Sequence, residues 1–253
     1  MLEPAAARAT TAPLTARAAP AATAPPGIPD YLDGNYWWAY LRPASIAIFD
    51  RTLVVTAILW GCYGRLKRAA LAELQAGNRV LQAACVYGDL SPRFAEALGP
   101  EGRLDVIDIA PLQAENCRRK LRAYPNARVR VADAAAPGGG SYDAAVCFFL
   151  LHELPDDHKR RVVDGLLGSV TPGGKVVFID YHGPRRLHPL RVPMSLVFHF
   201  LEPFAKMLWR REISSFVTHS KGFAWSKTTY FGGLYQKVVV TRLAPVDDAG
   251  RAE

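Results

Sequence analysis

The stretch VLQAACVYGDL, residues 80–90, decides the fold of this chain. Residues 80–84 form a short apolar strand that ends in a turn, and a helix begins directly after the turn. This order is typical of the first unit of an α/β domain that binds a nucleotide. Such a turn usually carries several glycines, whereas this one keeps only Gly88 and places Val86 and Tyr87 where a ligand is expected.

Segments typical of strands and of helices alternate after this turn. The apolar segments RLDVIDI (103–109), ARVRVADA (127–134), YDAAVCFFLL (142–151) and KVVFID (175–180) indicate strands, and helical patterns lie between them at 91–98, 111–124 and 156–170. The alternation predicts an α/β fold with a doubly wound, mostly parallel sheet. TTYFGG and LYQKVVVT (228–241) predict an antiparallel strand pair at its edge, joined at Gly232 and Gly233.

The composition divides the chain into six segments. We predict a disordered Ala/Pro-rich tail (1–28), an N-terminal helical segment (29–78), the α/β core (79–182), an inserted amphipathic lid (183–227), a terminal strand pair of the core (228–242) and a short tail (243–253). Within the helical segment, residues 52–74 have the pattern of a helix. No apolar stretch is both long enough and free enough of charge to predict a transmembrane helix.

Charge and cysteine content narrow the function classes. The net charge of +8 leaves nucleic acid, a membrane surface or a generally basic proteome as explanations, and no nucleic-acid recognition motif is present. The four cysteines form no CxxC pair, which argues against a zinc ribbon or a disulfide framework and favours a reducing compartment.

Acidic residues follow the second and third predicted strands. Asp108 stands where an acidic side chain can accept hydrogen bonds from ribose hydroxyls, and Asp133 is placed to meet an adenine edge. Each aspartate can instead be a helix N-cap. We predict cofactor binding by Ala84, Val86, Tyr87, Gly88, Asp108, Ile109, Asp133 and Ala134. S-adenosylmethionine fits better than NAD, because a diphosphate needs a glycine turn that Val86 and Tyr87 obstruct.

Several motifs taken together resemble the rhodoquinone biosynthesis methyltransferase-like family, which is related to the ubiquinone and menaquinone C-methyltransferases. They are VLQAACVYGD, DVIDIAPLQ, FFLLHELPDD, TPGGKVVFIDYHGP, HPLR and FGGLYQKVV, and YWWAYL and ILWGCYGRL extend the resemblance toward the N-terminus. LHELPDD or TPGG alone would indicate only a class I methyltransferase. The resemblance implies a class I methyltransferase-like, Rossmann-like sheet with N-terminal helices and an inserted lid.

The resemblance also implies a reaction. Members of that family are associated with converting ubiquinone to rhodoquinone, with an amino group replacing a ring methoxy group, S-adenosylmethionine as the amine source and Mn²⁺ assisting. We hypothesise that the bulk of Val86 and Tyr87 re-aims the methionine arm of the cofactor. The alternatives are a C- or O-methyltransferase acting on a prenylated quinone precursor, and a non-catalytic scaffold of a quinone-synthesis complex.

Candidate metal ligands and catalytic residues follow the fourth and fifth predicted strands. Glu153, Asp180 and His182 offer oxygen and nitrogen ligands that suit Mn²⁺, although His152 does not begin an HExxH motif. His152 can equally be an ordinary loop histidine. The predicted catalytic residues are Tyr87, Tyr181 and His182, with Tyr181 or His182 taking or relaying a proton.

The substrate implied by the resemblance, ubiquinone, is a lipid, so we expect peripheral membrane contact. Residues 192–209 carry phenylalanines and a tryptophan between flanking basic residues, the pattern of an interfacial helix attracted to anionic lipid. Such aromatics can instead belong to a core. The expected location is the cytoplasmic face of a bacterial inner membrane, or a mitochondrion if the N-terminal tail is a transit peptide. The oligomeric state stays open.

Overall fold

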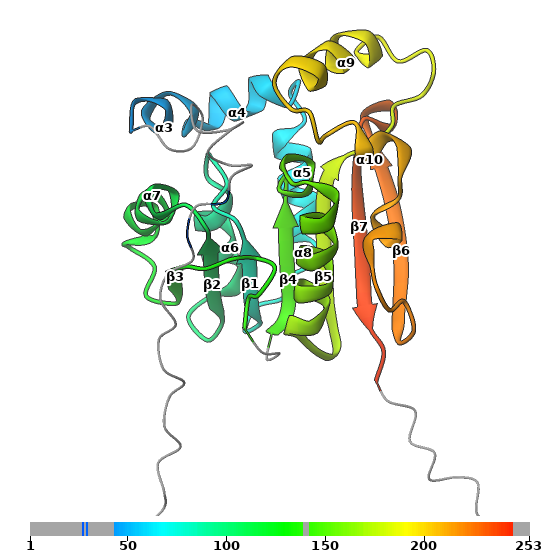
Figure 1. Cartoon of the computed structure of the whole chain (residues 1–253). Helices are drawn as coiled ribbons and strands as arrows, with labels where there is room; N and C mark the ends of the chain where they lie inside the picture. The colour runs from blue at the N-terminus through cyan, green and yellow to red at the C-terminus, as the bar shows by residue number, and fades with distance from the viewer. Residues whose placement is uncertain (1–26, 28, 30–42, 139–141, 245–253) are drawn as a thin grey trace, which may run out of the picture.

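The computed structural model describes residues 27, 29, 43–138 and 142–244. They form a seven-stranded sheet of order β3-β2-β1-β4-β5-β7-β6, with helices on both faces (Figure 1). The parallel strands are β1 (Arg79–Ala83), β2 (Arg103–Asp108), β3 (Ala127–Val131), β4 (Tyr142–Phe148) and β5 (Val170–Tyr181). The strands β7 (Tyr235–Arg242) and β6 (Phe223–Tyr230) continue the sheet in antiparallel pairing. The predicted doubly wound sheet with an antiparallel edge is confirmed.

The central strands are buried on both faces, as the unbroken apolar runs predict. In β4 the side chains of Ala144 and Val146 enter one core, and those of Ala145 and Cys147 enter the other. The first core is covered by α5 (Tyr63–Leu71), α6 (Leu90–Leu98) and α7 (Pro111–Leu121). The second is covered by α8 (Asp156–Ser169) together with the short helices α10 (Met207–Arg210) and η2 (Ile213–Phe216).

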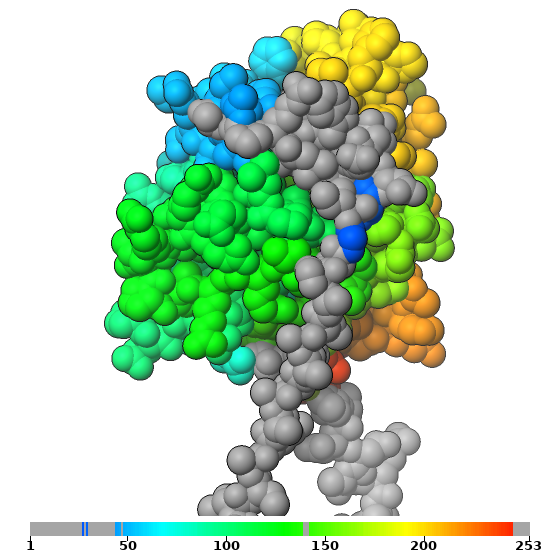
Figure 2. All heavy atoms as spheres, turned by 60° about the vertical axis from the view of Figure 1, so that its left-hand side comes forward, coloured from blue at the N-terminus to red at the C-terminus, as the bar shows by residue number. Residues whose placement is uncertain are grey.

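The strand order reverses between β1 and β4. From β1 the chain proceeds outward to β2 and β3, whereas from β4 it proceeds to β5 on the other side. The carboxyl ends of strands at such a point border a crevice that binds ligands in α/β sheets. The helices α3 (Pro43–Phe49), α4 (Thr52–Ile58) and α9 (Arg191–Phe200) lie across this end of the sheet (Figure 1), and Figure 2 shows the blue and yellow segments together at this end.

The helix predicted over 52–74 is two helices. Trp60 and Gly61 have φ angles of 51° and 80°, and a left-handed backbone ends a right-handed helix, so α4 and α5 are separate elements. The turn directs α4 across the carboxyl ends of the strands and α5 along the face of the sheet.

The lid differs from the prediction in its end and in its helices. It ends at residue 222, because β6 already begins at Phe223. The expected helix 192–209 is divided into α9 and α10 around Pro203, whose ring cannot donate a backbone hydrogen bond. The helix-like turns η1 (Leu151–Glu153) and η3 (Phe231–Gly233) complete the described elements.

Two predicted features fall wholly or mainly outside the described residues. They are the two tails and the aromatic stretch around Trp37 and Trp38. In the ranges that the structure does describe, no helix is both long enough and apolar enough to cross a membrane.

Candidate active site

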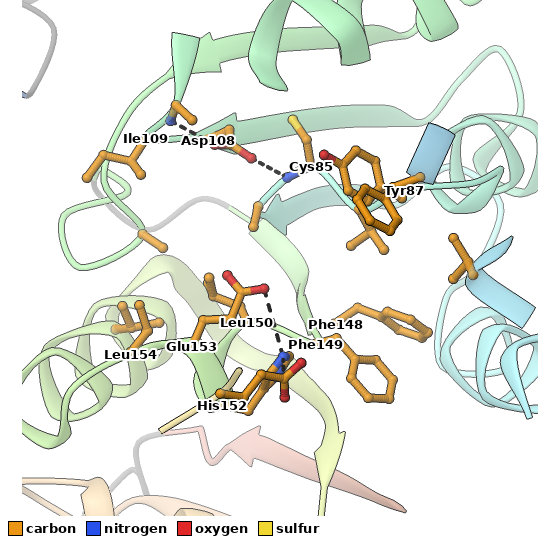
Figure 3. Close-up of a pocket in the computed structure, with 18 of the residues that line it drawn as sticks. Cys85, Tyr87, Asp108, Ile109, Phe148, Phe149, Leu150, His152, Glu153 and Leu154 are labelled. Carbon is orange, nitrogen blue, oxygen red and sulfur yellow. Dashed lines mark hydrogen bonds and ion pairs between the residues drawn. The ribbon is translucent and has the colours of Figure 1, made fainter. Parts of the chain in front are cut away.

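A cavity of about 380 Å³ lies beyond the carboxyl ends of the central strands, where the strand order reverses. Its wall includes seven of the eight predicted cofactor-binding residues: Ala84, Val86, Tyr87, Asp108, Ile109, Asp133 and Ala134. Figure 3 shows the upper part of this wall with Cys85, Tyr87, Asp108 and Ile109. Gly88, the eighth, belongs to the turn but not to the lining.

The backbone around the cavity is strained at two positions. Ala84 and Phe149, at the ends of β1 and β4, have φ angles of 68° and 51°. A left-handed conformation costs a non-glycine residue about 1–2 kcal/mol, and such residues concentrate at functional sites. Both residues line the cavity.

Gly88 occupies a position that requires glycine. Its φ is 84°, and an added Cβ atom would lie 3.0 Å from the Tyr63 hydroxyl oxygen. The backbone N–H of Gly88 donates to Asp50 Oδ1 at 2.7 Å. Asp50 also accepts hydrogen bonds from Lys120 Nζ and Asn116 Nδ2, at 2.8 and 2.6 Å, so it fastens the N-terminal helices to the turn. The sequence reasoning missed Asp50, because no local pattern links it to a turn 38 residues away.

Tyr87 is held in place on two sides. Its hydroxyl accepts a hydrogen bond from Gln113 Nε2 at 2.8 Å, and its ring stacks on Phe49 with the ring centroids 6.2 Å apart. Burial raises the pKa of the Tyr87 hydroxyl well above its ordinary value, so the group stays protonated at neutral pH. Tyr87 therefore forms part of the cavity wall and can donate a proton in a hydrogen bond, but it is a poor base.

Asp108 both accepts backbone hydrogen bonds, as a capping residue does, and lines the cavity, where it can bind a cofactor. Its carboxylate accepts hydrogen bonds from the backbone N–H groups of Cys85 (2.7 Å) and Ala110 (2.8 Å), as Figure 3 shows, and it faces the cavity. Burial raises its pKa to about 6, although both backbone bonds act in the opposite direction. An ionised carboxylate has about four acceptor sites, which leaves capacity for ribose hydroxyls.

Asp133 likewise accepts a backbone hydrogen bond and lines the cavity. Its Oδ1 accepts a hydrogen bond from the backbone N–H of Ala135 at 2.8 Å, and the residue lines the cavity beside Ala134. With Asp108, it places two carboxylates at the ends of β2 and β3 next to the turn after β1. This wall fits the nucleoside part of S-adenosylmethionine.

A buried acid and base cluster forms the opposite wall of the cavity. His152 Nδ1 lies 2.9 Å from Asp180 Oδ1, and His152 Nε2 lies 3.8 Å from carboxylate oxygens of both Glu153 and Glu202. Burial by itself would lower the pKa of His152, but the three negative charges raise it to about 9. The imidazole is therefore a cation at neutral pH, surrounded by carboxylates.

Glu202 is a site residue that the sequence reasoning did not identify. It follows α9 in the lid and lines the cavity, and its Oε2 atom is buried with no hydrogen-bond partner in the described part of the chain. Burial raises its pKa, while the His152 cation acts against this shift. The only signal in the sequence is one acidic residue inside an otherwise apolar stretch, FLEPF.

The structure does not bring the three predicted manganese ligands together as a metal site. The described ranges contain no group of three or more His, Cys, Asp or Glu side chains that could hold a metal ion. The Asp180 carboxylate is occupied by His152 and by the backbone N–H of Tyr181, and Glu153 lies beside His152. His182 lies apart from the cavity lining, with Nδ1 2.8 Å from the carbonyl oxygen of Gly233 and Nε2 3.5 Å from Lys227 Nζ.

Of the predicted catalytic residues Tyr181 and His182, only Tyr181 lines the cavity. Tyr181 lines the cavity, and its ring packs edge to face against His152, with the centroids 4.9 Å apart. Burial raises the pKa of Tyr181 well above its ordinary value, so it is not a base at neutral pH. His182 instead contacts Gly233 of η3 and Lys227 of β6, and it is not among the residues that line this cavity.

Comparison with known proteins gives the class of domain. Residues 80–174 match a family described as a methyltransferase domain. A protein-L-isoaspartate O-methyltransferase from Ignicoccus hospitalis is 32% identical over 110 residues, which are 42% of this chain and 48% of that protein. A ubiquinone/menaquinone biosynthesis C-methyltransferase, UbiE, from Pseudomonas fluorescens is 25% identical over 143 residues, 54% of this chain and 55% of the relative. The chain spans about half the length of these curated relatives.

Solved structures agree on the fold. An O-methyltransferase family protein from Burkholderia thailandensis superposes with a TM-score of 0.62 at 15% identity, covering 82% of this chain and 62% of that chain. A SAM-dependent methyltransferase from Aquifex aeolicus gives 0.53 at 17% identity, covering 80% and 99%. Residues 80–174 thus match a methyltransferase domain, and the fold is that of the class I methyltransferases. The chain is also distantly similar to UbiE-type quinone C-methyltransferases, a coarser finding than the rhodoquinone family.

Proposed function

We propose that this protein is an S-adenosylmethionine-dependent methyltransferase that acts on a carbon or oxygen atom of a prenylated quinone precursor. One observation carries the proposal: the nucleoside wall, the buried acid and base cluster and an apolar end all border one cavity. The apolar end is formed by Phe49, Val55, Leu59, Val197 and Leu201. It provides the dry surroundings that a prenylated ring requires.

The cofactor end is formed by residues at the ends of three strands. Asp108 would hold the ribose, Asp133 the adenine edge, and the turn from Ala84 to Gly88 would border the rest of the molecule. When bound, S-adenosylmethionine supplies an electrophilic methyl group. Because the amide groups of Cys85 and Ala110 already fix the Asp108 carboxylate, it is pre-organised for binding.

The acid and base cluster supplies the proton chemistry that methylation of a phenolic ring requires. The His152 cation, oriented by Asp180, stabilises negative charge on a ring oxygen. Glu202, whose Oε2 lacks a hydrogen-bond partner among the described residues, can accept the proton that leaves the substrate. Since burial raises the pKa of Glu202, it is a stronger base than an exposed glutamate.

The aromatic rings beside His152 support a flat, aromatic substrate. Phe149 and Tyr181 pack edge to face with ring centroids 5.2 Å apart, and Phe149 packs against His152 in the same way at 5.9 Å. Rings arranged like this favour contact with another aromatic ring. The names of the UbiE relatives point to a quinone as that ring.

Amination of ubiquinone to rhodoquinone is the second candidate. The observation in its favour is that Val86 and Tyr87 line the cavity at positions where this class of turn usually has glycine. The names of the curated relatives describe methyl transfer, which favours methylation as the main proposal. The two reactions differ in whether the methyl carbon or the amine nitrogen of the cofactor reaches the ring.

Isotope labelling separates these reactions. The purified protein is incubated with S-adenosylmethionine that carries ¹³C in the methyl group and ¹⁵N in the amine, together with either a demethylated prenylated quinol or ubiquinone. We expect ¹³C in the quinol product by mass spectrometry, and Glu202→Gln should abolish this signal while cofactor binding is retained. Transfer of ¹⁵N to ubiquinone with loss of methoxy would establish amination instead. If the cofactor binds but neither label appears in a product, methylation and amination are both overturned and a non-catalytic scaffold is supported.

A further inference from the structure

A basic hollow lies between α9 and α10, outside the catalytic cavity. Its volume is about 390 Å³, and the cationic side chains of Arg191, Lys206 and Arg210 contribute to its wall, whereas no acidic side chain of the described residues does. Trp209 also lines it, as do the exposed side chains of Val192 and Leu196, which together with the exposed Phe200 on the same helix are called the apolar rim. The chemistry of the hollow therefore suits an anion that is attached to an apolar group.

The side chains around the hollow are partly fixed in place. Arg191 Nη1 donates a hydrogen bond to the carbonyl oxygen of Pro184 at 2.6 Å, and its guanidinium lies 5.7 Å from the centre of the Trp209 ring. The indole Nε1 atom of Trp209 is buried and has no hydrogen-bond partner among the described residues. A guanidinium held in this way loses little conformational entropy when it binds a phosphate oxygen.

Exposed apolar side chains surround this hollow and continue across the mouth of the cavity. On α9, Val192 is 69% exposed, Leu196 56% and Phe200 74%. Leu53 and Ile58 of α4 are exposed in the same way. Both helices lie at the end of the molecule where the strand order reverses (Figures 1 and 2), and Ile58 also lines the cavity. Large apolar side chains that gather on one surface indicate a site of interaction.

We propose that this end of the molecule docks on a lipid bilayer and that the basic hollow binds the phosphate of an anionic phospholipid. The charges favour anionic lipid, since basic side chains near such a surface are attracted by its negative potential. The apolar rim favours a bilayer over a soluble anion, because Leu196 and Phe200 would then be removed from water. Docking in this orientation opens the catalytic cavity toward the hydrocarbon region, and it does not depend on which reaction the cavity performs.

Binding to lipid vesicles tests the proposal, with variants that alter either the basic hollow or the apolar rim. Lys206→Gln combined with Arg210→Gln removes charge from the hollow, and Leu196→Glu combined with Phe200→Glu removes the apolar rim. Matched controls are Arg68→Gln on α5 and Leu243→Glu, an exposed leucine after β7 at the opposite end of the sheet. Binding of S-adenosylhomocysteine, measured by calorimetry, reports whether each variant is folded.

We expect the protein to sediment with vesicles that contain phosphatidylglycerol and to bind pure phosphatidylcholine vesicles much more weakly. Loss of the two charges should weaken binding to the anionic vesicles about tenfold or more, and the rim variant should do the same, whereas both controls bind normally. Equal binding to both kinds of vesicle would overturn the role of the hollow. Binding of glycerol phosphate or inorganic phosphate without any vesicle binding would show a site for a soluble anion and overturn docking.

Discussion

His152 and Asp180 form a buried ion pair that joins the segment after β4 to the end of β5. The Asp180 carboxylate accepts a hydrogen bond from His152 Nδ1–H at 2.9 Å, and it also accepts hydrogen bonds from the backbone N–H groups of Tyr181 at 2.7 Å and His152 at 3.3 Å. These contacts fix the plane of the imidazole ring. As a result, the Nε2 side of His152 faces Glu153 and Glu202 at the wall of the cavity.

Replacing Asp180 should make His152 lose its charge. Burial opposes the cation, so Asp180→Asn is expected to lower the pKa of His152 from about 9, and NMR titration of the histidine ring measures this shift. The variant should also lose about 3 kcal/mol of unfolding free energy near neutral pH, because one partner of a buried pair is removed. The exposed His199, changed to glutamine, is the matched control. An unchanged titration of His152 would contradict the assigned pair.

The same pair gives the stability a definite dependence on pH. The pKa of His152 is raised above 6.5 in the folded state, so its contribution is fully present below pH 6.5 and is lost as the pH rises through about 9. Unfolding by urea at a series of pH values should therefore show the wild-type protein losing more stability over this window than Asp180→Asn. Parallel pH profiles of the two proteins would show that another group dominates.

Cofactor binding should depend on the ionisation of Asp108. Its pKa is raised to about 6, and protonation removes the charge that strengthens hydrogen bonds from ribose hydroxyls. The affinity for S-adenosylhomocysteine should therefore fall as the pH decreases through about 6, and Asp108→Asn should lower the affinity about tenfold at neutral pH. Calorimetric titration measures both effects, with Asp164→Asn on α8 as the control. A flat profile for the wild-type protein together with full affinity of Asp108→Asn would remove Asp108 from the ribose site.

The parts of the site that the sequence predicted are those that follow directly from strand ends. Asp108 and Asp133 could be placed because an apolar run marks where each strand ends, and parallel strands end at the same edge of the sheet. His182 was misplaced because its partner, the carbonyl oxygen of Gly233, comes from the segment before β7, and no local pattern shows that contact. Glu202 was missed for a related reason: only the folded lid brings it to His152.

The backbone conformation between α4 and α5 was also not predicted from the sequence. Trp60 and Gly61 have the positive φ angles that separate α4 from α5; tryptophan gives no sign of such a conformation in a sequence, and Gly61 was not interpreted as a break. The helical pattern of 52–74 was therefore interpreted as continuous, although it is two helices with different directions. The central strands β1, β2 and β4 caused no such difficulty, because burial on both faces leaves an apolar run.

Gly88 should be far less tolerant of substitution than Gly64. Gly88→Ala places a Cβ atom against the Tyr63 hydroxyl, which Asp89 holds at 3.0 Å, and it forces alanine to a φ angle of 84°. We expect a loss of about 2 kcal/mol. Gly64 lies in α5 with open space around it, so Gly64→Ala should stabilise the protein by up to about 1 kcal/mol. Urea unfolding compares the two, and an equal effect of both substitutions would contradict the described turn.

Lys159 should control the position of the lid. Its side chain is fully buried, and Nζ donates hydrogen bonds to the carbonyl oxygens of Leu154 at 2.5 Å and of Phe204 at 3.2 Å. Phe204 is two residues from Glu202, so this contact fastens the part of the lid that carries the proposed base. Lys159→Met retains the packing of the side-chain stem but leaves both carbonyl groups without this donor, which should cost about 2 kcal/mol.

Hydrogen exchange and kinetics together test this role of Lys159. In Lys159→Met, backbone amides of residues 201–210 should exchange faster, and turnover should fall while the affinity for S-adenosylhomocysteine stays the same, because Glu202 is displaced but the nucleoside wall is not. Lys227→Met is the matched control, since it removes an exposed ion pair with Glu212 that contributes less than about 1 kcal/mol. If the lid amides of Lys159→Met exchanged at the rate of the control, the buried lysine would not be what holds Glu202 beside His152.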